Sequence, residues 1–235
     1  MIQIKTLASA ADWAQAAADH LTGTLSQAID ETGHALFAGS GGSTPAPIYG
    51  RMAAADLDWS RVTATLVDER YVPETSPDSN AALLKQTLLT GPAAQARLLP
   101  LYSAQVTVDR AGAETTRRLD QAGGRIDAAL LGMGEDGHIC SMFPHSPTLR
   151  TLLTPGLKPA VYGVPTGRDG LAPSLERLTI NLPYLMGARL VVLALKGATK
   201  RKVLEREAAG DPAIHPIAAL VAAKVNLEVL WTEAD

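Results

Sequence analysis

The chain has 235 residues, enough for one large domain or two small ones with a substantial buried core. Its 46% hydrophobic and 19% charged residues are typical of a globular protein, and its net charge of -3 gives no electrostatic footprint for nucleic acid or an anionic membrane. The single cysteine excludes an intrachain disulfide, and the sequence has neither a secretion signal nor an apolar run long enough to span a bilayer. We therefore expect a cytoplasmic protein whose partners include no membrane and no nucleic acid.

Predicted strands and helices alternate along the chain. Apolar and β-branched runs predict strands at 2–7, 35–38, 62–67, 98–102, 127–131, 160–164, 177–180, 190–195 and 226–231. Periodicity and capping residues predict helices over about 10–30, after residue 45, and over about 80–89, 108–121 and 199–209. This alternation implies an α/β fold, a Rossmann-like open, mainly parallel sheet with helices on both faces. Because no repeat or long linker divides the sequence, we expect one α/β domain over 1–235.

A glycine-rich loop follows the second predicted strand. It reads Gly39-Ser40-Gly41-Gly42-Ser43-Thr44-Pro45 and leads into a helix. Backbone N–H groups of such a loop, together with the helix N-terminus and the hydroxyls, can cradle a phosphate. The loop lacks the Gly-Lys-Ser/Thr ending of a P-loop and the spacing of a dinucleotide fingerprint, so it indicates neither a nucleoside triphosphate nor NAD. Taken alone, it is also consistent with an ordinary structural turn.

Polar groups follow three more predicted strands. Asp68-Glu69-Arg70 comes after 62–67, Gly132-Met133-Gly134-Glu135-Asp136-Gly137-His138 after 127–131, and Lys196 after 190–195. The carboxyl ends of parallel strands meet at one edge of the sheet, which is where open α/β sheets bind ligands. We expect these groups and the glycine loop to form one site there, although scattered solvent-facing loops are the simpler alternative.

The chemistry expected of this site is proton transfer on a phosphorylated small molecule. His138 can titrate near neutral pH and act as a general base, while Lys196 and Arg177 can bind the phosphate. Two alternatives stay open at this point: Lys196 facing water at a strand end, and Asp136 bonding the glycine turn instead of orienting His138. The other histidines show no ligand spacing with His138, so we expect no metal.

At these residues the sequence resembles the 6-phosphogluconolactonase family. The resemblance rests on the glycine loop, Asp68-Glu69-Arg70, the 132–138 turn with Ser141-Met142-Phe143-Pro144, Arg177-Leu178-Thr179 and Lys196-Gly197. These motifs occur in family order and span nearly the whole chain. The related glucosamine-6-phosphate deaminases share the fold and a Gly-Asp-Gly-His turn, but Asp68-Glu69-Arg70 and Ser141-Met142-Phe143-Pro144 favour the lactonase.

The resemblance implies hydrolysis of 6-phospho-D-glucono-1,5-lactone to 6-phosphogluconate, the second step of the oxidative pentose phosphate pathway, without a cofactor or metal. It implies that His138 activates water, that Asp136 supports His138 and that Arg70 lies near the substrate ring. It implies a substrate site formed by the following residues: Gly41, Gly42, Ser43, Thr44, Asp68, Arg177 and Lys196. The small-molecule sugar phosphate is the expected partner, and we expect a monomer or a weak homodimer.

Two other functions remain open, and the sequence departs from the family pattern in places. One is an amino-sugar phosphate deaminase or isomerase, which needs an acid at Asp68 as a carbon base. The other is a non-catalytic sugar-phosphate sensor, which would not need His138. Ile139-Cys140 and His145 depart from the family's usual residues, and the loop 172–176 lacks a second proline. Cys140 could serve as a nucleophile beside His138, but the family does without one.

Overall fold

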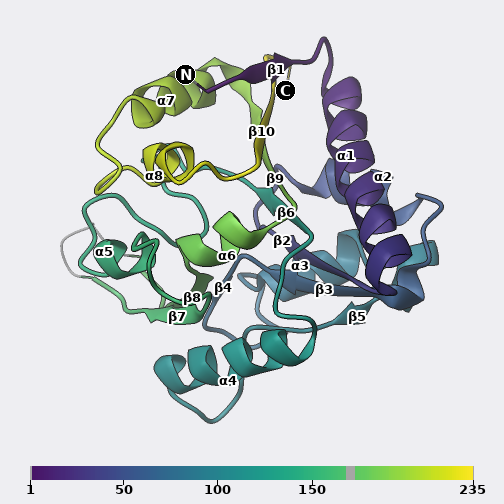
Figure 1. Cartoon of the computed structure of the whole chain (residues 1–235), viewed down its shortest axis with the longest axis horizontal. Helices are drawn as coiled ribbons and strands as arrows, with labels where there is room; N and C mark the ends of the chain where they lie inside the picture. The colour runs from purple at the N-terminus through teal and green to yellow at the C-terminus, as the bar shows by residue number, and fades with distance from the viewer. Residues whose placement is uncertain (1, 168–172, 235) are drawn as a thin grey trace.

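The computed structural model describes residues 2–167 and 173–234, and its core is a parallel sheet. Within these residues seven strands pair in the order β1-β10-β9-β6-β2-β3-β5, all parallel (Figure 1). Their bounds are β1 Ile4–Thr6, β2 Ala35–Gly39, β3 Val62–Leu66, β5 Arg97–Leu98, β6 Ala128–Leu131, β9 Leu190–Lys196 and β10 Leu227–Thr232. The open, mainly parallel sheet expected from the sequence is therefore confirmed.

Helices cover both faces of the sheet, as expected. Figure 1 shows α1 (Ala10–Thr32) and α2 (Ala46–Ala53) on one side, and α7 (Gly197–Ala208) and α8 (Pro216–Ala222) on the other. The remaining helices are α3 Asn80–Thr87, α4 Val108–Gln121, α5 Leu149–Leu152 and α6 Leu182–Gly187, with 3-10 turns at Trp59–Arg61 and Gly91–Gln95. The central strands β2, β6 and β9 are buried on both faces, which explains their uniformly apolar sequences.

The helix boundaries follow the local signals in the sequence. Ser9 caps α1, its hydroxyl accepting the Asp12 N–H at 3.1 Å, and Gly33 ends that helix with φ 82°. Ser79 caps α3 in the same way, accepting the Ala82 N–H at 3.2 Å. A side-chain cap or a glycine with positive φ depends only on neighbouring residues. The sequence alone therefore predicted these helix ends well.

A second, antiparallel sheet departs from the expected pattern. The strands β4 (Asp68–Arg70), β8 (Arg177–Ile180) and β7 (Val161–Val164) pair with one another in that order. The sequence had placed 160–164 and 177–180 among the strands without separating them from the main sheet, and it had placed Asp68-Glu69-Arg70 after a strand, not in one. β7 instead packs against α4. Part of the loop 172–176 and the end of the segment after β7 lie outside the described residues.

Other differences are shorter elements. The strand expected at 98–102 is only Arg97–Leu98, which pairs with Thr63 and Ala64. The short helices α5, α6 and α8 had no counterpart in the sequence prediction. In the part of the chain that the structure describes, no helix is long and apolar enough to cross a membrane.

Candidate active site

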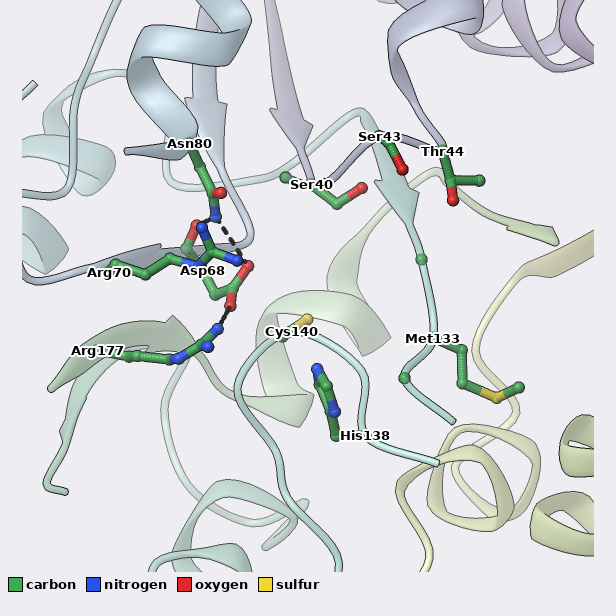
Figure 2. A pocket seen from close by; sticks show the side chains of 14 residues that line it. Ser40, Ser43, Thr44, Asp68, Arg70, Asn80, Met133, His138, Cys140 and Arg177 are labelled. Atoms are coloured by element: carbon green, nitrogen blue, oxygen red, sulfur yellow. Dashed lines mark hydrogen bonds and ion pairs between the residues drawn. The ribbon is translucent and has the colours of Figure 1, made fainter. Parts of the chain in front are cut away.

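A cavity of about 260 Å³ opens at the carboxyl ends of β2, β3 and β6 (Figure 2). Residues from the glycine loop, from β4 and β8, from the start of α3 and from the turn after β6 form its walls. They are Ser40, Gly41, Gly42, Ser43, Thr44, Asp68, Arg70, Asn80, Gly132, Met133, Gly134, His138, Cys140 and Arg177. Segments about 137 positions apart in the sequence thus meet here, because the parallel sheet brings its strand ends to one edge and β4 and β8 of the antiparallel sheet add to the same cavity.

The glycine loop is shaped by close packing against α3. A Cβ on Gly41 would lie 1.8 Å from the Asn80 Oδ1 atom, so a side chain at position 41 would displace Asn80. Gly42 has φ 89°, a left-handed conformation that favours glycine. The buried Ser40 Oγ has no hydrogen-bond partner among the described residues, and Ser40 lines the cavity. The loop therefore presents backbone and an unused hydroxyl to a ligand ahead of the N-terminus of α2.

Because of the pleat of β4, alternate side chains of Asp68-Glu69-Arg70 point in opposite directions. Asp68 and Arg70 line the cavity, while Glu69 points away and is 1% exposed. Its carboxylate accepts the N–H groups of Asn80 at 2.7 Å and Ala81 at 2.8 Å, at the N-terminus of α3. Burial raises the pKa of Glu69 even though these donors oppose the shift. Glu69 thus holds α3, and with it Asn80, against the cavity.

Asp68 is the centre of a hydrogen-bond network on one wall. Its Oδ2 atom accepts the Ser141 hydroxyl at 2.6 Å and faces the Arg177 Nη1 atom at 3.4 Å (Figure 2). Asn80 donates to the Asp68 backbone carbonyl at 2.9 Å. Arg70 donates to the Asp78 carbonyl at 2.7 Å. Both guanidinium groups are therefore oriented, and each keeps a buried Nε atom without a partner among the described residues.

The turn after β6 holds the His138 imidazole. Asp136 Oδ1 lies 2.6 Å from His138 Nδ1 and also accepts the His138 N–H at 3.2 Å. A carboxylate can only accept, so Nδ1 carries the proton of the neutral ring and Nε2 keeps the lone pair. Among the described residues Nε2 has no hydrogen-bond partner. Burial would raise the pKa of Asp136, but its hydrogen bonds to His138 and the charge of that ring together lower it.

The turn is compact because Gly134 has no side chain. The Gly134 N–H donates to the His138 carbonyl at 2.8 Å, which closes the turn. A Cβ on Gly134 would lie 2.2 Å from Asp136 Oδ1 and 2.3 Å from His138 Nδ1. On the other side, the Phe143 ring lies 4.5 Å from the imidazole, centroid to centroid, and 5.5 Å from the Arg177 guanidinium carbon. The ring of His138 is thus fixed from two directions.

Two lysines lie near the junction of β9 and α7: Lys196, which is expected to bind the phosphate, and Lys200. Lys196 ends β9 and is not among the described residues that line the cavity. Lys200, one turn into α7, donates to the carbonyl of Met133 at 2.6 Å, and Met133 does line the cavity. Lys200 was not among the residues expected in the site.

Cys140 lines the cavity but is not prepared as a nucleophile. The residue is 7% exposed, and burial raises the pKa of its thiol well above the ordinary value, with the Asp68 charge adding to the shift. A thiolate, not a thiol, is the reactive form. Across the described residues there is also no group of three His, Cys, Asp or Glu side chains that could hold a metal ion.

Comparison with known proteins identifies the family. The model of the glucosamine-6-phosphate isomerases/6-phosphogluconolactonase family matches residues 8–231. The chain belongs to this family. Among curated members, it is 37% identical to a 6-phosphogluconolactonase of Caulobacter vibrioides over 99% of this chain and 98% of the relative. It is 39% identical to one of Rhizobium meliloti over 93% of each.

Solved structures of family members have the same fold. A 6-phosphogluconolactonase from Shewanella baltica superposes with a TM-score of 0.89 at 29% identity, covering 99% of this chain and 98% of the other. A monomeric glucosamine-6-phosphate deaminase superposes with a TM-score of 0.75 at 17% identity, covering 98% and 97%. The second likeness shows only that the two branches of the family share the fold.

Proposed function

We propose that the protein is a 6-phosphogluconolactonase that hydrolyses 6-phospho-D-glucono-1,5-lactone to 6-phospho-D-gluconate, the second step of the oxidative pentose phosphate pathway. The observation that carries the proposal is the Asp136–His138 pair, 2.6 Å apart, at a cavity lined by a glycine-rich loop and two arginines. A base with a free lone pair, an anion cradle and guanidinium groups are what hydrolysis of a phosphorylated lactone needs. The lactonase relatives support the same assignment.

The proposed reaction begins with water bound next to His138. Nε2 takes a proton from the water as its oxygen attacks the lactone carbonyl carbon, and Asp136 stabilises the imidazolium that forms. The tetrahedral intermediate then collapses, the bond between the carbonyl carbon and the ring oxygen breaks, and His138 returns the proton to that oxygen. No covalent intermediate is needed, because the lactone is already an activated ester.

The cavity walls would perform the binding. Gly41, Gly42, Ser43 and Thr44, ahead of the N-terminus of α2, suit the phosphate, because backbone N–H groups and hydroxyls can donate to its oxygens. Lys200 is the described lysine whose ammonium already bonds a residue of the cavity wall. Arg70 and Arg177, on the Asp68 side in Figure 2, suit the sugar ring and the developing oxyanion.

The position of Asp68 argues against the deaminase alternative. A carbon base must have a carboxylate free to reach the substrate. The Oδ2 atom of Asp68 instead accepts the Ser141 hydroxyl at 2.6 Å and faces Arg177 at 3.4 Å. Asp68 therefore serves better as a support for Arg177 than as a base that takes a proton from carbon.

The test is to compare two substrates and one variant. The freshly generated lactone and glucosamine 6-phosphate are assayed side by side, with the spontaneous hydrolysis of the lactone subtracted. We expect turnover of the lactone alone, and a loss of kcat of about 10²- to 10⁴-fold in His138→Ala with 6-phosphogluconate still bound. Deamination of glucosamine 6-phosphate, or full turnover in His138→Ala, would refute the assignment.

The remaining expectations concern the whole protein. We propose that 1–235 act as a single domain, since one cavity takes residues from 40 to 177. A monomer or weak homodimer, acting in the cytoplasm on a small-molecule sugar phosphate without metal or cofactor, remains the prediction. Light scattering across a concentration series measures the oligomeric state.

A further inference from the structure

A buried carboxylate lies directly behind the turn that carries His138. Glu207, in the last turn of α7, has a side chain that is only 3% exposed, whereas the Glu205 side chain on the same helix is 55% exposed. Its Oε2 atom lies 2.7 Å from His215 Nδ1, and its Oε1 atom 2.9 Å from Arg206 Nη2. Burying a carboxylate costs desolvation energy that its hydrogen bonds only partly offset. Stability alone is therefore a weak reason for placing Glu207 here.

Glu207 packs against Gly137, in the space that a side chain at position 137 would otherwise occupy. Gly137 has φ 91°, and a Cβ there would lie 2.3 Å from the Glu207 Cδ atom and 2.5 Å from Oε2. The carboxylate thus occupies the place of the missing side chain. Gly137 is the residue between Asp136 and His138, and its N–H donates to the Gly134 carbonyl at 3.2 Å. A shift of Gly137 would therefore move both members of the proposed base pair.

The partner of Glu207 contacts the far end of the same segment. The His215 ring meets the His145 ring edge to face, with centroids 6.2 Å apart. His145 ends the stretch that runs from His138 through Phe143, the residue that stacks on the His138 ring. His215 itself fits closely, since a Cβ on Gly210 would lie 2.2 Å from its Cδ2 atom. The Glu207–His215 pair therefore touches the catalytic segment at both ends, at Gly137 and at His145.

We propose that Glu207 is a positioning residue, which acts through Gly137 to keep the His138 imidazole directed at the cavity. The inference rests on the proposed function, in which His138 is the base. It requires contact between the Glu207 side chain and Gly137, and not the negative charge itself. His215 holds the carboxylate in that contact.

Two substitutions separate contact from charge. Glu207→Gln keeps the length of the side chain and its packing on Gly137 but removes the charge. Glu207→Asp keeps the charge but withdraws the carboxylate by one methylene. We expect Glu207→Asp to lower kcat about tenfold or more and Glu207→Gln to stay within about threefold, with the Kd of 6-phosphogluconate nearly unchanged in both. Glu205→Asp, the same change at an exposed site on α7, is the matched control and should leave kcat unchanged.

A shortened buried carboxylate can unfold a protein, so His215→Gln is measured in parallel. Without its partner ring the Glu207 carboxylate can swing from Gly137, and the same loss of kcat with unchanged product affinity is expected. In a His138→Ala background Glu207→Asp should cause no further loss, because the two residues act in series. Unchanged kcat in both Glu207→Asp and His215→Gln, or a loss of product affinity equal to the loss of kcat, would overturn the proposal.

A spectroscopic measurement separates this proposal from the proposed function. The turnover of the wild-type protein tests the lactonase assignment by itself. Imidazole ¹H–¹⁵N correlations of His138, assigned with His138→Ala, report the position of the ring whether or not the lactone is a substrate. A changed His138 signal in Glu207→Asp but not in Glu205→Asp supports positioning, and identical signals in both contradict it.

Discussion

Gly134→Ala should impair the proposed base while leaving the side chains of Asp136 and His138 chemically unchanged. The added Cβ would lie 2.2 Å from Asp136 Oδ1 and 2.3 Å from His138 Nδ1, where ordinary contact begins at 3.4 Å. Both groups, or the backbone that carries them, must therefore move by about 1 Å, and a misplacement of that size costs about 10²-fold in rate, or roughly 2.7 kcal/mol. We expect kcat for the lactone to fall about 100-fold while the affinity for 6-phosphogluconate changes little.

The assay follows 6-phosphogluconate formation with a coupled dehydrogenase, with spontaneous hydrolysis subtracted. Gly50→Ala makes the same chemical change on α2 at a position where nothing lies within 4 Å of the new Cβ, so it should leave kcat unaltered. A Gly134→Ala protein whose kcat stays within about threefold of wild type would refute the reasoning, because the pair at 2.6 Å would then not set the rate.

Three further outcomes are expected. Lys200→Met should raise KM for the lactone about tenfold or more, whereas Lys196→Met should change KM less than about twofold. Steady-state kinetics measure both values. The reverse order would show that Lys196 binds the phosphate, as predicted from the sequence. The lowered pKa of Asp136 means that its pairing stabilises the fold above the pKa of an unfolded aspartate, and that this contribution is lost as the pH falls through the lowered value. Denaturation of wild type and Asp136→Asn should therefore differ most near neutral pH and converge in acid, and a difference that grows in acid would contradict the pairing. Gly50→Ala, in the exposed interior of α2, should stabilise the protein by about 0.5–1 kcal/mol, visible as a higher Tm, and a lower Tm would show that the helix is strained there.

The parts of the site that the sequence predicted are those with local causes. The glycine loop and the 132–138 turn each follow a short apolar strand, and in both cases the strand, its end and the glycines lie within about a dozen residues. Parallel topology then places both turns at one edge whatever the details of packing. For that reason His138 and the glycine loop reach the same cavity, as expected.

The parts that the sequence missed depend on contacts between distant segments. The separate antiparallel sheet depends on the pairing of Asp68-Glu69-Arg70 with β8, more than a hundred positions later. The hydrogen bond from Lys200 to the Met133 carbonyl depends on how α7 packs beside the turn after β6. Glu207 resembles any charged residue of an amphipathic helix until the fold places Gly137 against it. None of these contacts leaves a periodic or local trace in the sequence.

Asp68 explains how a site for an anionic substrate can hold a buried acid. The Arg177 side chain is 17% exposed, and burial lowers its pKa, as does the nearby charge of Arg70, while Asp68 opposes both effects. The Asp68 charge therefore offsets the repulsion between the two guanidinium groups. When the substrate brings its own negative charge, Arg177 can exchange a contact of 3.4 Å with Asp68 for one with the ligand. The Ser141 hydroxyl would still hold Asp68 Oδ2 at 2.6 Å in that complex, which argues against a role for Asp68 as the base that takes a proton from carbon.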